Sequence, residues 1–166
     1  MRFISLYLAL FLLIMASSLS SCSVSKQPIL LQSTDEISYD FNQLTQNCVV
    51  LIYSYECGYS LQGIPKYNKL KEELSHIEGL QFVAFAEQSL EESIARYPEN
   101  VEVLTHDLNW IKFVGYNHFY EKIWRKNVFP EFIYFKNGKR KKTLIAPYDH
   151  ELIEFKQYIL KKNKTS

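Results

Sequence analysis

Residues 48–60 of this chain read Cys-Val-Val-Leu-Ile-Tyr-Ser-Tyr-Glu-Cys-Gly-Tyr-Ser. Cys48–Ser54 is apolar and rich in β-branched residues, which is typical of a central strand that is buried on both faces. A helical pattern follows from Gly58 to Ile77. Cys57 therefore stands where a strand passes into a helix, and the N–H groups and dipole of a helix N-terminus favour a negatively charged thiolate. The stretch predicts a strand, a candidate reactive thiol and a helix in succession.

Strands and helices are predicted to alternate along the rest of the chain. A short strand or extended lead-in is expected at 37–41, a short helix at 40–46, and the Asn137–Gly138 pair predicts a hairpin turn. The other predicted elements are strands at 80–86 and 101–104, helices at 89–97 and 107–126, hairpin strands at 132–135 and 141–145, and a closing helix at 150–161. This order predicts an α/β fold with a central mixed sheet flanked by helices.

The first 21 residues have the pattern of a targeting segment. Arg2 is followed by a nearly unbroken apolar run, which is too short and wrongly flanked for a membrane-spanning helix. The run ends in Leu19-Ser20-Ser21-Cys22, which resembles the lipobox of bacterial lipoproteins. The sequence thus predicts a signal peptide at 1–21, a lipid on Cys22, a tether at 22–36 and one domain at 37–166. The alternative is an ordinary signal peptide cut nearby, with Cys22 left as a free thiol.

Composition sets limits on partners and cofactors. The chain has 19 basic and 18 acidic residues, and Arg2 lies in the predicted signal, so the remainder is formally neutral. Such a balance gives no indication of a nucleic-acid partner. The four histidines are scattered without ligand spacing, so no metal and no other cofactor is expected.

Four features, in order, resemble the thioredoxin superfamily, and in particular the membrane-tethered extracytoplasmic TlpA-type thioredoxins. They are the aromatic approach Ile52–Cys57, Cys57-Gly58-Tyr59-Ser60 in the Cys-x-x-Cys position, Pro65 within the following helix, and Val128-Phe129-Pro130 before a strand. The resemblance implies a thioredoxin fold with a helical insertion at 89–97 and 107–126. It also implies a cis peptide bond before Pro130, with Tyr59 and Phe129 in a substrate groove beside Cys57.

Departures from the family pattern alter the implied chemistry. Ser60 replaces the second thiol, and Leu51 and Gly63 stand where relatives carry acids. Ser60 is expected to cap the helix and to hydrogen-bond the Cys57 sulfur. Glu56 replaces a tryptophan, and its carboxylate would disfavour the thiolate that the helix favours. Cys48 lies roughly 20 Å away along the strand, too far to form a disulfide with Cys57.

The sequence leaves more than one function open. The first is a lipid-anchored monothiol thiol–disulfide exchange protein, with Cys57, Ser60 and Pro130 in its site and an external thiol as reductant. Its partners would be exported proteins or small thiols that carry disulfides, in the bacterial cell envelope. The alternative is a catalytically impaired binding or scaffold module. A thiol peroxidase is disfavoured, because Val50 stands where that family needs a proline.

Overall fold

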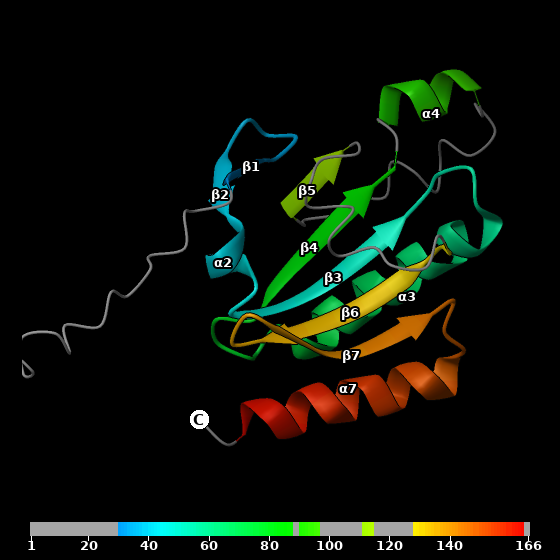
Figure 1. The fold of residues 1–166 in the computed structure, drawn as a ribbon. Coiled ribbons are helices and arrows are strands. Elements are labelled where there is room, and N and C mark those ends of the chain that lie inside the picture. Colours follow the sequence, from blue (N-terminus) through cyan, green and yellow to red (C-terminus); the bar gives the residue numbers. More distant parts are fainter. Residues whose placement is uncertain (1–29, 88–89, 97–110, 115–127, 165–166) are drawn as a thin grey trace, which may run out of the picture.

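The computed structural model describes residues 30–87, 90–96, 111–114 and 128–164. Its centre is a five-stranded mixed sheet in the order β5-β4-β3-β6-β7 (Figure 1). β3 is parallel to β4 and β4 is parallel to β5, whereas β6 and β7 run antiparallel to their neighbours. The strands are β3 (Asn47–Tyr53), β4 (Gln81–Ala86), β5 (Ile111–Val114), β6 (Glu131–Lys136) and β7 (Lys139–Ile145). The predicted mixed sheet is confirmed.

β3 is the central strand, as its apolar sequence predicts. Every residue from Cys48 to Tyr53 is buried, because β4 and β6 flank the strand and side chains pack on both of its faces. The predicted hairpin of β6 and β7 turns at Asn137 and Gly138, whose φ angles of 54° and 68° lie in the left-handed region that this turn requires. The turn is attached to the start of β3, since Asn137 N–H donates to the Gln46 carbonyl.

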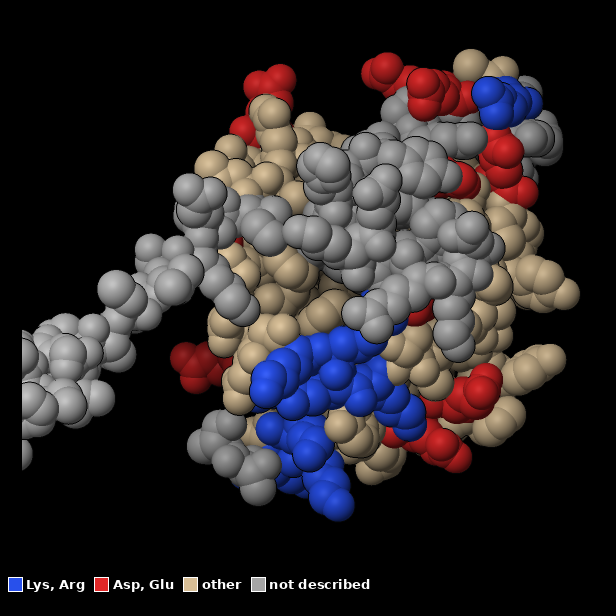
Figure 2. All heavy atoms as spheres, in the orientation of Figure 1, with Lys and Arg blue, Asp and Glu red and all other residues tan. Residues whose placement is uncertain are grey.

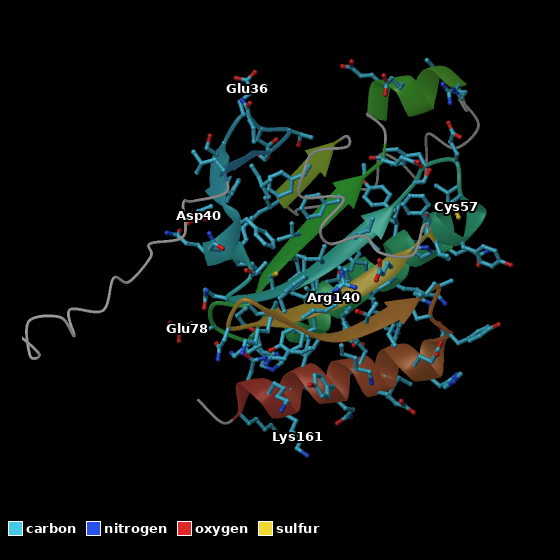
Figure 3. The ribbon with its side chains drawn as sticks, in the orientation of Figure 1. Glu36, Asp40, Cys57, Glu78, Arg140 and Lys161 are labelled. Atoms are coloured by element: carbon cyan, nitrogen blue, oxygen red, sulfur yellow. The ribbon has the colours of Figure 1, made fainter. Side chains whose placement is uncertain are left out.

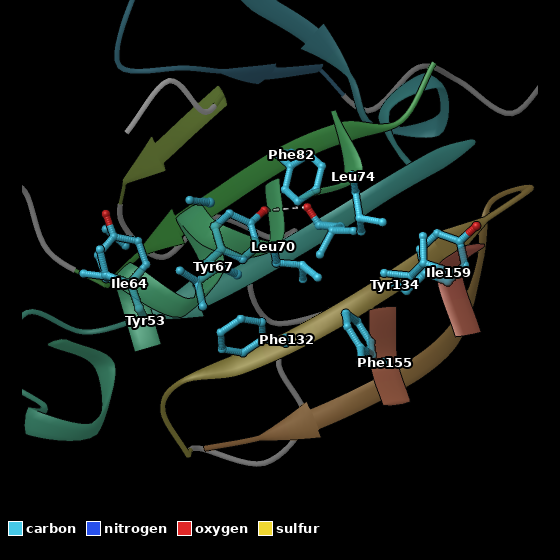
Figure 4. Packing of buried hydrophobic residues seen from close by; sticks show 14 of the residues in the cluster. Tyr53, Ile64, Tyr67, Leu70, Leu74, Phe82, Phe132, Tyr134, Phe155 and Ile159 are labelled. Carbon is cyan, nitrogen blue, oxygen red and sulfur yellow. Dashed lines mark hydrogen bonds between the residues drawn. The ribbon is translucent and has the colours of Figure 1, made fainter. Parts of the chain in front are cut away.

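Two helices cover one face of the sheet. α3 (Gly58–Leu74) and α7 (Asp149–Asn163) share a core with alternate residues of β3, β4 and β6. Figure 4 shows this packing around Tyr67, which is fully buried. The Tyr67 hydroxyl is 2.7 Å from the Val49 carbonyl oxygen and accepts from Val83 N–H at 3.0 Å, so it joins α3 to two strands.

The opposite face carries a second core. Leu44 of α2 (Phe41–Leu44) and Leu31 of β1 (Leu30–Gln32) are buried there against the sheet. β1 pairs antiparallel with β2 (Ser38–Asp40), the predicted short strand. The sequence placed residues 30–32 in the tether. In the structure, Leu31 is buried in the second core, and β1 pairs with β2. Within the described residues, both cores are built from Leu31 and the residues after it.

The region predicted as a helical insertion differs from expectation where it is described. The helix expected from residue 89 is present as α4 (Leu90–Arg96). Ile111–Val114, predicted to be helical, is instead the edge strand β5. Phe113 stacks on Phe85 with ring centroids 4.9 Å apart, and pairing with β4 outweighs the local helical pattern. The strand expected at 101–104 and the remainder of 107–126 lie outside the described residues.

The predicted signal peptide, the lipid-bearing Cys22 and most of the tether also lie outside the described residues. Within the described part of the chain, no helix has the length and apolarity needed to cross a bilayer.

Candidate functional site

Cys57 lies at the junction of β3 and α3. It is the N-cap residue of α3, and its carbonyl accepts hydrogen bonds from Ser60 N–H at 2.8 Å and from Leu61 N–H at 3.1 Å. The residue is half-buried and lies at one end of the sheet (Figure 3). The residue caps the N-terminus of α3, where backbone N–H groups and the helix dipole carry a partial positive charge.

The loop before β6 brings a backbone carbonyl to this sulfur. The Phe129–Pro130 peptide bond is cis, as the resemblance implied. The Cys57 thiol donates a weak hydrogen bond to the Phe129 carbonyl, with 3.7 Å between Sγ and O. The Pro130 carbonyl accepts instead from Ala146 N–H of the β7–α7 loop at 2.8 Å. Residues 72 positions apart in sequence thus meet at the thiol.

Ser60 is a structural residue in the position of a second thiol. Its side chain is fully buried, and its Oγ accepts a hydrogen bond from Ser54 N–H at 3.2 Å. Among the described contacts, Ser60 Oγ has this bond to Ser54 N–H and none to the Cys57 sulfur, which the sequence analysis had expected. The hydroxyl instead ties the first turn of α3 to the end of β3, because the Ser54 N–H has no water available at this depth.

Two further departures from the family pattern are explained by packing. Leu51 is fully buried in the core under α3, where an isolated carboxylate would be costly. Gly63 lies against Pro130, and a Cβ built on it would come within 2.8 Å of Pro130 Cγ. The second candidate acid position therefore has no room for a side chain. At this position the backbone of α3 packs directly against the Pro130 ring.

The charge beside the thiol is balanced. Glu56 forms an ion pair with Arg96 of α4, in which Arg96 Nη1 donates to Glu56 Oε1. Both side chains lie at the surface, so solvent screens the pair. Arg96 is a cationic partner of Glu56 that the sequence analysis did not identify.

A groove of about 360 Å³ runs beside the proline loop. Tyr59, predicted as a groove residue, lines it with 68% of its surface exposed, and Tyr148 at the start of α7 is 71% exposed on the same lining. Gly63 and Pro130 also line it. Phe129 contributes differently from the prediction, because its ring packs on the second core while its carbonyl faces Cys57.

Glu131 follows Pro130 and is the first residue of β6. It is 1% exposed, and its Oε1 accepts from Arg140 Nη1 at 3.2 Å across the β6–β7 hairpin. Burial of a carboxylate is tolerated when a cation and hydrogen bonds compensate it. The Glu131–Arg140 ion pair thus links β6 to β7.

Cys48 lies at the other end of β3 and has no access to solvent. Burial raises the pKa of its thiol to about 12. Neither Cys48 nor Cys57 forms a disulfide bond in the structure. This environment supports the role of a small buried hydrophobic residue for Cys48.

Comparison with solved structures finds the same architecture. The exposed lipoprotein thioredoxin Etrx1 of Streptococcus pneumoniae is 15% identical, with a TM-score of 0.59 over 81% of this chain and 98% of that one. The thioredoxin domain of a Bacteroides vulgatus thiol-disulfide oxidoreductase is 13% identical, with a TM-score of 0.57 over 79% and 92%. A secreted Mycobacterium tuberculosis disulfide oxidoreductase, homologous to DsbE, is 10% identical, with a TM-score of 0.57 over 80% and 95%.

The chain has a thioredoxin fold. No family model and no curated protein sequence matches it. The likeness therefore lies in the arrangement of the elements, with Cys57 at the N-terminus of α3 and Pro130 facing it.

The sequence predicted Cys57, Ser60 and Pro130 as site residues. In the structure, Ser60 N–H donates to the Cys57 carbonyl, and the Cys57 thiol donates to the carbonyl of Phe129, the residue before Pro130. The sequence analysis missed the contact of Gly63 with Pro130 and the approach of the Ala146–Tyr148 loop. A signal for that loop existed, since the Asn137–Gly138 turn fixes the β6–β7 register and places Ala146 near Pro130. The Arg96 partner of Glu56 had no such local signal.

Proposed function

We propose that the protein is an extracytoplasmic thioredoxin-like protein that performs monothiol thiol–disulfide exchange through Cys57. The observation that carries the proposal is the pairing of a half-buried cysteine with a buried hydroxyl. Cys57 is half-buried at a helix N-terminus, and its Sγ lies 3.7 Å from the Phe129 carbonyl oxygen. Ser60 is fully buried, and its Oγ accepts a hydrogen bond from Ser54 N–H. Such a site can attack a disulfide but has no second thiol to resolve the product.

The exchange needs two steps. The Cys57 thiolate attacks one sulfur of a substrate disulfide, a Cys57–substrate disulfide forms, and the other substrate sulfur leaves as a thiolate. An external thiol, as its thiolate, then attacks the substrate sulfur of this mixed disulfide and releases the Cys57 thiolate. No net electrons enter or leave Cys57 over the cycle, so the protein shuffles disulfides between an exported protein or small disulfide and the external thiol.

The location is proposed from the predicted leader. A lipid on Cys22 would hold the domain at a membrane of the bacterial cell envelope, facing a compartment that permits disulfides. Etrx1 of S. pneumoniae is described as an exposed lipoprotein and the M. tuberculosis protein as secreted, which agrees with this placement. Metabolic labelling with a fatty-acid analogue tests the anchor, since label should be lost in Cys22→Ala.

A trapping experiment tests the exchange. A chain that begins at Ser23 is mixed with a peptide disulfide, and adducts are measured by intact mass. We expect a Cys57-dependent mixed disulfide that persists until glutathione is added, with Cys48→Ala behaving as wild type and Cys57→Ala giving no adduct. In Ser60→Cys the adduct should resolve without glutathione, because residues three apart on a helix have Cβ atoms about 5–6 Å apart.

Two results would contradict the proposal. One is that the folded protein forms no adduct at Cys57 when it is mixed with the peptide disulfide. The other is function in cells that survives Cys57→Ala but is lost when the Pro130 loop is altered, which would indicate the binding-module alternative.

A further inference from the structure

Basic side chains gather at the end of the molecule that lies away from Cys57. Figure 2 shows them as one cluster over β7 and the C-terminal part of α7, with acidic side chains bordering it at the lower right and others at the top and left. The chain as a whole has a formal charge of only +1, so this cluster does not reflect an excess of cations over the whole chain. We call this surface the basic pole, and it consists of Lys136, Lys139, Lys141, Lys142, Lys161, Lys162 and Lys164.

A β-bulge places lysines of β7 on one face. Directly paired residues of antiparallel strands share a face, and here Lys139 pairs with Lys136 while Lys142 pairs with Tyr134. The register shift between Tyr134 and Phe135 means that one residue of β7 is extra. Lys139 and Lys142 therefore point to the same side, although they are three residues apart. That side is the one covered by α7.

Two ammonium groups meet at one ring on this side. Lys142 Nζ lies 5.7 Å and Lys162 Nζ 5.6 Å from the centre of the Tyr158 ring. The ring attracts each cation, but the two cations repel one another. No carboxylate within the described part of the chain lies in ion-pair distance of either lysine. The same holds for Lys139, Lys141 and Lys164.

Ordinary structural roles account for only part of the pole. Lys161 and Lys162 stand in the last turn of α7, where cations favour the helix dipole. Lysines on β7 also discourage pairing of this edge strand with another chain. Neither the helix-dipole role nor the edge-strand role requires that Lys142 and Lys162 both lie over the Tyr158 ring without a carboxylate partner. A negatively charged surface would lower the repulsion among them.

We propose that the basic pole is a docking surface for an anionic lipid bilayer. Charge complementarity supports it, and so does the point at which the chain enters the fold. Leu30 pairs with Asp40, which leads into α2, and the Thr45 carbonyl just after α2 accepts from Gly138 N–H of the β6–β7 turn. The residues that precede Leu30 thus join the domain at the end where β7 begins.

Docking by this surface would orient the thiol. Lys136 pairs with Asn47 at the start of β3, whereas Cys57 follows its other end. A strand of seven residues separates the two ends by roughly 20 Å. A bilayer bound at the basic pole would therefore leave Cys57 pointing into the surrounding compartment. The docking does not depend on whether Cys57 exchanges disulfides.

Vesicle co-sedimentation tests the docking. The chain that begins at Ser23 is mixed with vesicles of phosphatidylcholine, alone or in an equal mixture with phosphatidylglycerol. We expect binding to the mixed vesicles only, and its loss between about 0.1 M and about 1 M salt as the Debye length falls from about 10 Å to about 3 Å. Lys142→Gln/Lys162→Gln should weaken binding about 30-fold, since each lysine near an anionic surface contributes about fivefold.

A charge-matched variant provides the control. Lys69→Gln/Lys71→Gln removes the same charge from α3 and should bind within about twofold of wild type. Circular dichroism and gel filtration confirm that each variant is folded and monodisperse. Equal weakening by both variants would mean that net charge alone acts, and would overturn the proposal. Binding of soluble polyphosphate as tightly as of vesicles, or binding to phosphatidylcholine alone, would overturn it as well.

Discussion

Gly63→Ala tests whether packing against Pro130 shapes the site. An alanine Cβ would come within 2.8 Å of Pro130 Cγ and 3.3 Å of its Cβ, so the proline ring or α3 must move. Overpacking of this kind costs about 1–3 kcal/mol. Alanine in a helix interior returns about 0.5–1 kcal/mol relative to glycine. We expect a net loss of about 1–2 kcal/mol, which lowers the Tm by roughly 3–6 °C.

Gly58→Ala is the matched control. Gly58 is in the first turn of the same helix, and a Cβ there meets nothing within 4 Å. The substitution should stabilise the protein by about 0.4–1 kcal/mol through the unfolded state. Urea unfolding followed by circular dichroism measures both variants. The reasoning is refuted if Gly63→Ala is as stable as wild type, or if the two variants shift the free energy of unfolding in the same direction.

Three other predictions concern buried hydroxyl and thiol groups and the charge beside the site. Tyr67→Phe should lower the free energy of unfolding by about 2–3 kcal/mol, because backbone groups of two buried strands lose their partner. Burial raises the pKa of Cys48 to about 12, so stability should fall as the pH rises from about 9 toward 12, where the unfolded chain ionises this thiol first. Arg96→Ala should slow alkylation of Cys57 at neutral pH by up to about threefold, and Glu56→Gln should accelerate it.

Each of these has its own control. Tyr148→Phe removes a hydroxyl at an exposed position and should leave urea unfolding unchanged. Cys48→Ala should reduce the decline between pH 9 and 12, measured by unfolding at several pH values; an unchanged decline would show that other groups cause it. High salt should shrink the effects of Arg96→Ala and Glu56→Gln, and effects that are independent of salt would argue against an electrostatic cause.

Local pattern was sufficient for the main elements. The apolar run of β3, the helical pattern of α3 and the turn at Asn137–Gly138 each depend on neighbours in sequence, and each was predicted within a few residues. β5 was missed because Ile111–Val114 lies in an aromatic stretch whose spacing also suits a helix. Its strand state depends on the free edge of β4, which no local pattern reveals. Leu31 was assigned to the tether for a similar reason.

The sequence by itself determined that Cys57 stands at a strand-to-helix junction, that the second thiol is missing, and that a proline loop precedes the last hairpin. These are statements about residue types and spacing. Only the tertiary structure decided what the replacing residues contact. Ser60 Oγ accepts a hydrogen bond from Ser54 N–H, Gly63 leaves space for the Pro130 ring, and Glu56 forms an ion pair with Arg96. Contacts between segments far apart in sequence depend on how the sheet and helices pack, and sequence spacing does not report that geometry.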